Sequence, residues 1–344
     1  MRVGAVERLR GFESTEALLR TLLLHVGRGY SLRETVVQAQ LAGIAEVSDV
    51  AFLKRLRNAE EWLRELCLRM LLESGVTLAH PGQARRVRVV DGTIVREPGK
   101  TGSQWRLLYS LQLPSLLCDF FELTATEGAG TGETLSRLPV AAQDLVLADA
   151  GYCSPSGIAY IREQQADVIV RLNPQTFPLR TARGRKKNLL RQLHQIRQVG
   201  QVGDWPAWME TESQGRIAGR ICALRKSEQA VEQAQRRLRR RASKKQTHLR
   251  PETLEYARYV AVFTTWTQAE ASEILEWYRS RWQIELVFKR LKSLLGLGHL
   301  PKYDERSSRA WLYAKLFIAL LAHKLIRIGR EISPWGYLQV SSAG

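Results

Sequence analysis

The sequence predicts an α/β protein in which a mixed sheet flanked by helices follows a helical N-terminal region. Three observations predict this fold. Residues 1–80 have leucines at helical spacing, residues 86–172 contain three strand patterns followed by a strand-helix-strand pattern, and a strand followed by helices returns after residue 255. Successive strands favour antiparallel pairing and strand-helix-strand favours parallel pairing, so we expect both in one sheet.

The first region, residues 1–80, is predicted to contain two helices joined by a short turn. Ser31-Leu-Arg-Glu-Thr has the pattern of a helix N-cap, Gly43 is expected to end that helix, and another helix begins after Ser48. Such a pair is compatible with a helix-turn-helix that reads DNA. It is equally compatible with a plain bundle whose charged face is solvated.

Residues 81–179 are predicted to form the first part of the sheet. Gly- and Pro-bearing turns separate the first three strands, which favours a meander. The strands are expected at 87–90, 105–113, 118–125, 145–148 and 168–172, with helical segments at 133–137 and 156–165.

Residues 180–255 form a basic, partly β-rich insertion. Between residues 180 and 250 there are 19 Lys and Arg residues but only 5 Asp and Glu residues, in a chain whose net charge is +18. A helix beginning after Ser227 would carry the densest cluster, which includes Arg236, Arg237 and Arg240. The block is interpreted as a surface that contacts nucleic acid, and the alternative is a solvated basic arm.

Composition excludes several other classes of protein. A chain this basic is no acidic disordered protein, and its charge indicates a polyanionic partner. An anionic membrane is not favoured, because the most apolar run, 316–322, is far shorter than the roughly 20 residues of a span. The N-terminus lacks the apolar stretch of a signal peptide, and the four cysteines form no Cys-x-x-Cys pair, so we expect a cytoplasmic protein with free thiols.

Residues 256–333 are predicted to complete the sheet domain. The strand 259–264 precedes a long helix over 268–295, and a last helix spans 309–329, followed by a short tail at 334–344.

Two aspartates are placed where strands are expected to end. Asp91 lies in Val89-Val-Asp-Gly-Thr, and Asp149 lies in Val146-Leu-Ala-Asp-Ala-Gly-Tyr. A carboxylate fixed at a sheet edge is a good ligand for a hard cation. Taken singly, either Asp is more typical of a turn, because Asp-Gly is common turn chemistry.

The long helix contains a polar stripe. At about 100° per residue, Tyr278, Arg281, Glu285 and Lys292 fall within roughly 60° of one another. A lone Glu between cations on a helix is usually an exposed ion-pair position, so spacing alone does not decide its role.

Together these residues resemble a known family. Asp91-Gly-Thr, Asp149-Ala-Gly-Tyr and the Tyr-Arg-Glu-Lys pattern at 278, 281, 285 and 292 are similar, in this order, to the DDE transposases of bacterial insertion sequences, in particular the insertion-sequence-four family. The resemblance covers about residues 86–325, and the Tyr-Arg-Glu-Lys pattern is its most specific part.

The resemblance implies an RNase H-like core interrupted by the basic insertion. It also implies that Asp91, Asp149 and Glu285 are catalytic ligands of two divalent ions, normally Mg²⁺ with Mn²⁺ as a substitute. Two such ions can activate water and stabilise a leaving oxygen during phosphodiester hydrolysis. The implied reaction is cut-and-paste transposition, in which hydrolysis frees a 3′-OH at the element's end and that 3′-OH attacks target DNA.

The implied partners are double-stranded DNA, both terminal inverted repeats and target, and a second copy of the chain in a DNA-bound homodimer associated with the bacterial nucleoid. Trp266 could stack on an extruded base, although a strand-end packing role is the plainer interpretation. The alternative function is a catalytically inactive DNA-binding protein derived from a transposase; an RNA-binding module is not indicated. The residues expected to contact DNA are Tyr278, Arg281, Lys292, Lys289, Arg236, Arg237, Arg240 and Trp266.

Overall fold

A computed structural model describes residues 9, 11–73, 85–96, 104–128, 132–173, 177–211, 215–293, 295–298, 300–301 and 304–331. The domain boundary expected near residue 80 and the tail expected at 334–344 lie outside these residues. Within them, no helix is long and apolar enough to cross a membrane.

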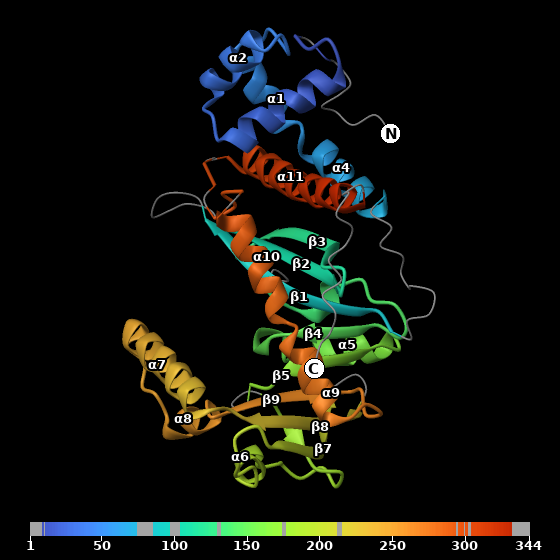
Figure 1. The fold of residues 1–344 in the computed structure, drawn as a ribbon, viewed down its shortest axis with the longest axis vertical. Coiled ribbons are helices and arrows are strands. Elements are labelled where there is room, and N and C mark those ends of the chain that lie inside the picture. Colours follow the sequence, from blue (N-terminus) through green and yellow to red (C-terminus); the bar gives the residue numbers. More distant parts are fainter. Residues whose placement is uncertain are drawn as a thin grey trace.

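One large mixed sheet runs through the middle of the molecule (Figure 1), and its described strands follow the order β3-β2-β1-β4-β5-β9-β8-β7-β6. β1, β4 and β5 are parallel to one another, and the remaining neighbours are antiparallel, which confirms the predicted mixed sheet. The strands are β1 Val87–Arg96, β2 Gln104–Leu113, β3 Leu117–Ala125, β4 Leu145–Ala148, β5 Asp167–Arg171, β6 Leu179–Arg180, β7 Val202–Thr211, β8 Gly215–Arg225 and β9 Tyr259–Thr264.

Helices cover both faces of the sheet. Two separate clusters of buried apolar side chains fill the space beneath them, one under α4, α9, α10 and α11 and the other under α5, α6 and η1. The helices are α1 Thr15–Arg28, α2 Leu32–Leu41, α3 Asp49–Arg57, α4 Glu60–Glu73, α5 Pro155–Glu163, α6 Leu189–Leu193, α7 Glu228–Lys245, α8 Pro251–Tyr256, α9 Ala271–Arg279, α10 Trp282–Ser293 and α11 Glu305–Glu331, with short 3-10 helices η1 Leu135–Arg137 and η2 Ala150–Tyr152.

The N-terminal helices form as their local sequence predicts. Ser31 makes a capping box with Glu34 at the start of α2, Gly43 follows that helix with φ of 64°, and Ser48 caps α3. α1, α3 and α4 pack on the C-terminal helix α11, so these helices share one apolar cluster with the sheet. DNA reading by this region stays a prediction.

The strand β1 corrects one expectation. The sequence places Asp91 at a strand end, but β1 continues through Asp91 and Gly92 to Arg96, because β2 pairs with it along its whole length. Only the pairing with β4 stops there: Val90 opposite Ala148 is its last pair. Asp91 therefore lies inside one strand and just past the end of its other neighbour.

The expected single helix over 268–295 is also corrected, because the chain forms α9 and α10 with a turn at Ser280 and Arg281. The Arg281 N–H donates to the Tyr278 carbonyl at 3.1 Å, three residues back, instead of continuing the α-helical pattern. α9 packs on β7 and β8 while α10 packs on β1, so the turn lets one segment follow two parts of the sheet.

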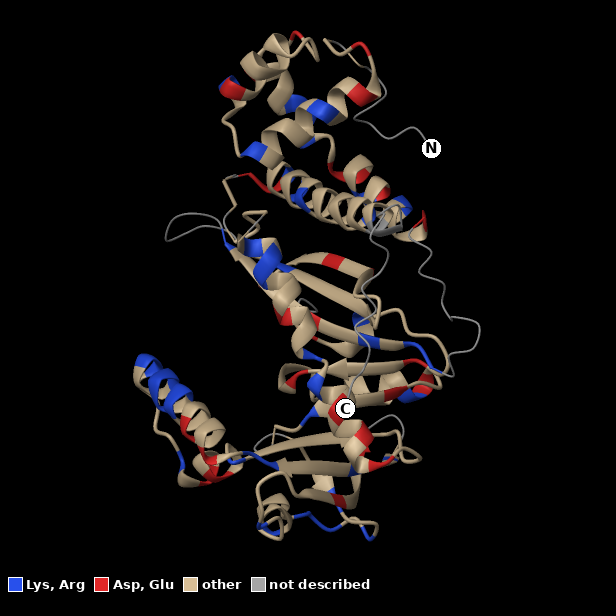
Figure 2. Ribbon diagram, in the orientation of Figure 1, with Lys and Arg blue, Asp and Glu red and all other residues tan. Residues whose placement is uncertain are grey.

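The basic insertion does not form a sheet of its own. Its strands β7 and β8 join the core sheet through the β8–β9 pairing. Ser227 caps α7 as predicted, and α7 projects from the edge of the molecule with its Lys and Arg residues gathered toward the far end (Figure 2).

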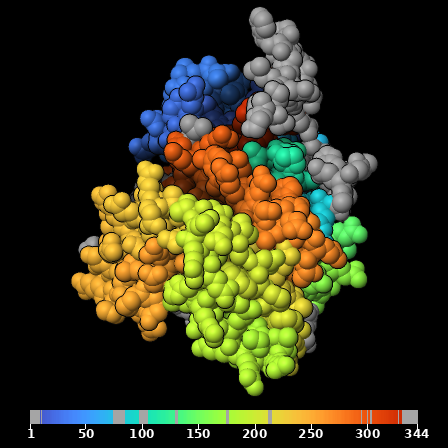
Figure 3. Space-filling view, turned by 60° about the horizontal axis from the view of Figure 1, so that its bottom comes forward, coloured from blue at the N-terminus to red at the C-terminus, as the bar shows by residue number. Residues whose placement is uncertain are grey.

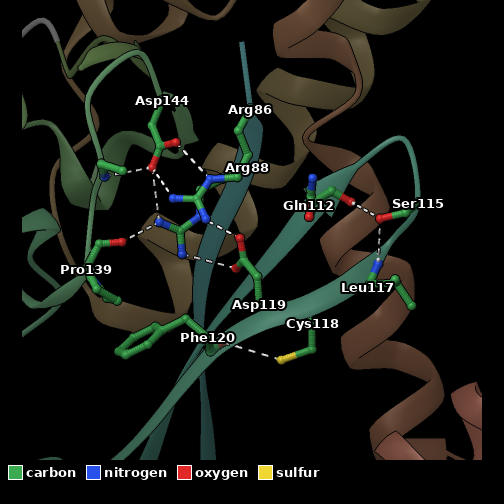
Figure 4. A network of polar contacts seen from close by, with 11 residues as sticks. Arg86, Arg88, Gln112, Ser115, Leu117, Cys118, Asp119, Phe120, Pro139 and Asp144 are labelled. Carbon is green, nitrogen blue, oxygen red and sulfur yellow. Dashed lines mark hydrogen bonds and ion pairs between the residues drawn. The ribbon is translucent and has the colours of Figure 1, made fainter. Parts of the chain in front are cut away.

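A buried ionic network joins β1 to β3 and to the loop before β4 (Figure 4). The Arg88 Nε lies 2.7 Å from Asp119 Oδ2, and Arg86 pairs with Asp144 through two guanidinium nitrogens. Arg88 and Asp119 have side chains only 1% and 2% exposed. These ion pairs lie near the start of β1. They hold β1, which carries Asp91 further along, against β3 and the loop before β4.

Candidate active site

Asp91 and Asp149 lie side by side. β1 and β4 are parallel and end their pairing at Val90 and Ala148, so the next residue of each strand is an aspartate. Asp149 precedes η2, but its side chain makes no capping hydrogen bond there. Both residues are half-buried at the end of this strand pair.

The surroundings of Asp91 disfavour its negative charge. Burial, with a smaller effect from the nearby carboxylates of Asp149 and Glu133, raises the pKa of this carboxyl to about 6 against the opposing effects of the Gly92 N–H and Arg281. The Gly92 N–H donates to Asp91 Oδ1 at 2.8 Å. Burial therefore makes ionisation of this carboxyl unfavourable in the folded chain.

The turn between α9 and α10 brings the helical part of the motif against Asp91. Arg281 Nη1 lies 3.9 Å from Asp91 Oδ2, and its Nη2 donates to Glu285 Oε1 at 2.5 Å. The guanidinium also lies over the Tyr278 ring, 5.9 Å from its centroid. The structure thus brings the predicted residues Asp91, Arg281 and Glu285 together, with Arg281 between the two carboxylates.

The other predicted residues of this segment lie further out. Lys289 and Lys292 are exposed on α10, one and two turns beyond Glu285 on the same face of the helix. Trp266 is not brought to the acids: it is half-buried beside the start of β5, the opposite end of the parallel strands from Asp149, and the Arg85 guanidinium covers its ring at 4.7 Å.

A basic cavity of about 490 Å³ lies between α7, α8 and the sheet. Its cationic lining residues are Arg171, Lys226, Arg237 and Arg241, and no described acidic residue lines it. Burial, with the Arg171 charge, lowers the pKa of Lys226 to about 8. Arg171 follows Val170, the strand partner of Ala148, so the cavity borders the strand end that leads into Asp149.

The remaining basic residues of α7 do not line this cavity. Arg236 and Arg240 are exposed, and Arg237 alone of the three predicted α7 contacts borders the cavity. The surface of α9 and α10, orange in the space-filling view, lies between the yellow-green insertion strands and the blue N-terminal helices (Figure 3). The two regions predicted to contact DNA therefore flank the helices of the site.

The structure brings two of the three predicted metal ligands next to each other. Asp91 and Asp149 are adjacent carboxylates, whose oxygens are of the type that hard divalent cations prefer. Glu285 is 58% exposed and turned to Arg281, and the described residues contain no group of three acidic, His or Cys side chains arranged to hold a metal.

Sequence reasoning missed two residues of this site. The carboxylate of Glu133 lies against Gly92 and Gly151, and the buried Tyr152 hydroxyl lies beside it. The Tyr152 hydroxyl has no hydrogen-bond partner among the described residues. The sequence signal for Glu133 is the glycine in each aspartate motif, Gly92 and Gly151. From sequence alone these glycines predict turns, because the segment that packs against them is not known.

An aspartate within β1, an aspartate directly after β4 and a glutamate on α10 agree with the class of enzymes that cleave phosphodiesters with divalent cations. The particular family follows from comparison with known proteins: the chain belongs to the transposase DDE domain family, whose model matches residues 82–321. Membership of this family implies a divalent-metal cofactor.

Curated relatives agree along nearly the whole chain. The protein InsL of insertion sequence element IS186A from Escherichia coli K12 is 34% identical over 340 residues, which cover 96% of this chain and 90% of the relative. The transposase for insertion sequence element IS421 from Escherichia coli is 34% identical over 341 residues with the same coverage. A solved structure, the catalytic domain of human endonuclease V, is 13% identical with a TM-score of 0.29 over 69% of this chain and 97% of that one, which is too low to support an argument.

Proposed function

We propose that the chain catalyses cut-and-paste transposition of an insertion sequence of the insertion-sequence-four family. It hydrolyses DNA at the ends of its own element and joins the freed 3′-OH to target DNA. The observation that carries this proposal is the placement of Asp91 and Asp149 at adjacent strand positions with the Arg281–Glu285 pair against them, inside a transposase DDE domain.

Asp91, Asp149 and Glu285 are proposed to hold two Mg²⁺ ions, for which Mn²⁺ can substitute. When bound, such ions supply a water nucleophile at neutral pH and charge stabilisation for the leaving oxygen. Glu285 exchanges its bond to Arg281 for a place in the ligand set. Arg281 is then free to bind a phosphate through two parallel N–H groups, with Lys292 further along α10 holding another phosphate.

The part of the sheet that carries the site is proposed to be an RNase H-like core. This is supported by the order β3-β2-β1-β4-β5, with antiparallel pairing on one side of β1 and parallel pairing on the other. In domain terms, we propose a DNA-binding region at 1–80, core parts at 81–179 and 256–333 and the insertion at 180–255.

The DNA is proposed to run from the N-terminal helices over α9 and α10 to the insertion. The basic cavity and the exposed arginines of α7 supply cations without described acidic neighbours in the cavity lining. Such contacts bind phosphates without reading sequence, so they position the duplex. Because the two ends of the element must be held in one complex, we propose that the active species is a DNA-bound homodimer at the nucleoid.

The test uses a duplex with the inverted repeats that flank the gene, incubated with the purified chain and Mg²⁺ or Mn²⁺. Asp91→Ala, Asp149→Ala and Glu285→Gln are compared with Glu273→Gln, a control at an exposed glutamate of α9. Nicking at the repeat end and duplex binding are measured in parallel. We expect wild type and control to nick the end, and the three active-site variants to bind without nicking.

Two outcomes would contradict the proposal. If neither wild type nor any variant nicks the repeat while all bind it, the chain is an inactive DNA-binding derivative of a transposase. If Glu285→Gln nicks as fast as wild type, the third ligand is another residue.

A further inference from the structure

Glu133 lies between the two strand ends that carry the aspartates. A Cβ added to Gly92 would be 3.0 Å from Glu133 Oε1, and one added to Gly151 would be 3.0 Å from Glu133 Oε2. Neither glycine has a positive φ, so neither is required by its backbone conformation. The missing side chains instead make room for one carboxylate, each of whose oxygens faces one of the two motifs.

This position brings Glu133 to the site from the side opposite to Glu285. Successive residues of a strand face opposite sides of the sheet, so Asp91 shares the face of Val89, which belongs to the cluster under α10. The space of a Gly92 side chain lies on the other face, with Leu135 of η1 two residues after Glu133. Acidic side chains therefore approach the ends of the β1–β4 pairing from both faces of the sheet.

The ion pair of Glu133 is long. Its Oε1 lies 3.6 Å from Arg106 Nε, and its side chain is 32% exposed. A carboxylate held close to a second carboxylate costs free energy unless a cation is shared between them.

An independent observation points to a ligand at the same spot. Tyr152 is only 1% exposed, and its hydroxyl has no hydrogen-bond partner among the described residues. That hydroxyl lies 3.3 Å from the Cβ position of Gly92, beside Glu133. A buried hydroxyl is normally paired, so its position indicates a group that arrives with the bound state, such as a water molecule carried by a cation.

We propose that Glu133 is a fourth carboxylate of the divalent-cation site, holding the cation bound by Asp91 from the face of the sheet opposite to Glu285. The Tyr152 hydroxyl accepts a hydrogen bond from a water molecule in the shell of that cation. This inference rests on the proposed function, because it presupposes that Asp91 holds a metal ion.

The experiment measures binding of Mn²⁺ to the full chain without DNA, by isothermal titration calorimetry and by the electron paramagnetic resonance signal of free Mn²⁺. Glu133→Gln keeps the shape of the side chain and removes its charge. The matched control is Glu122→Gln, because Glu122 is likewise a partly exposed glutamate paired with an arginine, Arg137. Asp91→Asn serves as the reference for loss of the site.

We expect Glu133→Gln to weaken Mn²⁺ binding about tenfold, the scale seen when groups that support metal ligands are removed. Glu122→Gln should bind Mn²⁺ as wild type does. Gly151→Ala provides a second variant, because its methyl group displaces the Glu133 carboxylate while the charge is retained, and it should weaken Mn²⁺ binding in the same direction. Circular dichroism of each variant shows whether it is folded.

Two results separate failure of this inference from failure of the proposed function. If folded Glu133→Gln binds Mn²⁺ within twofold of wild type while Asp91→Asn does not bind it, Glu133 is no ligand and the catalytic site stands. If Asp91→Asn also binds Mn²⁺ normally, the metal site is elsewhere and both proposals are overturned.

Discussion

Replacing Asp91 by Asn is expected to stabilise the metal-free protein while removing its activity. The folded-state pKa of Asp91, about 6, lies above its ordinary value of 3.8. Ionisation of this carboxyl therefore favours the unfolded chain. The penalty is absent below about pH 3.8, grows between pH 3.8 and 6, and is complete above pH 6.

The size of the effect follows from the shift. A displacement of about 2 pKa units corresponds to about 3 kcal/mol, and we expect about 1–3 kcal/mol because the side chain keeps 22% of its exposure. Asn retains an oxygen that can accept from the Gly92 N–H and gives up only the long contact with Arg281. For a chain of 344 residues this amounts to about 1–4 °C in melting temperature.

The assay is thermal unfolding of wild type and Asp91→Asn in excess EDTA at pH 4.5 and pH 8. The variant should melt higher at pH 8, and the difference should shrink at pH 4.5. Asp204→Asn is the control, because Asp204 is a partly exposed aspartate near Arg220 and its replacement should bring no such gain. A variant that melts below wild type at pH 8 in EDTA would refute the electrostatic reasoning.

Three further predictions concern stability and binding. Asp119→Asn should cost about 3–5 kcal/mol in the free energy of unfolding measured with urea, because it leaves the Arg88 charge buried with one partner fewer; a loss below 1 kcal/mol would contradict this. Gly219→Ala should lower stability by about 1–3 kcal/mol in calorimetry, since its Cβ would lie 2.4 Å from the Phe263 ring; an unchanged melting temperature would argue against that packing. Arg237→Ala should reduce the slope of log K against log salt for duplex DNA by about 1, as measured by fluorescence anisotropy, and an unchanged slope would place the DNA elsewhere.

The parts of the fold set by local sequence were predicted well. Helix caps such as Ser31 and Ser227 were found because an N-cap acts on residues two or three positions away. The strands that follow one another directly were found because alternation and turn residues lie within the same segment. The sequence predicts too short a strand at Asp91, because Asp-Gly is typical of a turn, and only the pairing with β2 extends β1 to Arg96.

The structure brings the predicted site residues together only in part, for a physical reason. Family motifs in the sequence predict Asp91, Asp149 and Glu285, but the position of a long flexible side chain depends on which charge it meets, and Glu285 meets Arg281. Glu133 was not predicted, because its relation to Gly92 and Gly151 arises only when a loop packs against two strand ends. Trp266 was assigned from its residue type, and its distance from the acids follows from the antiparallel course of β9 along β5.

The insertion cannot be excised as if it were an appendage. β9 lies between β5 on one side and β8 on the other, so its backbone groups are hydrogen-bonded along both edges. A shortened chain lacking 180–255 would leave one of these edges bare, and a bare edge recruits strands from other molecules. Attempts to obtain a minimal nuclease by trimming this protein should therefore yield aggregates unless the exposed edge is redesigned with charged residues or proline.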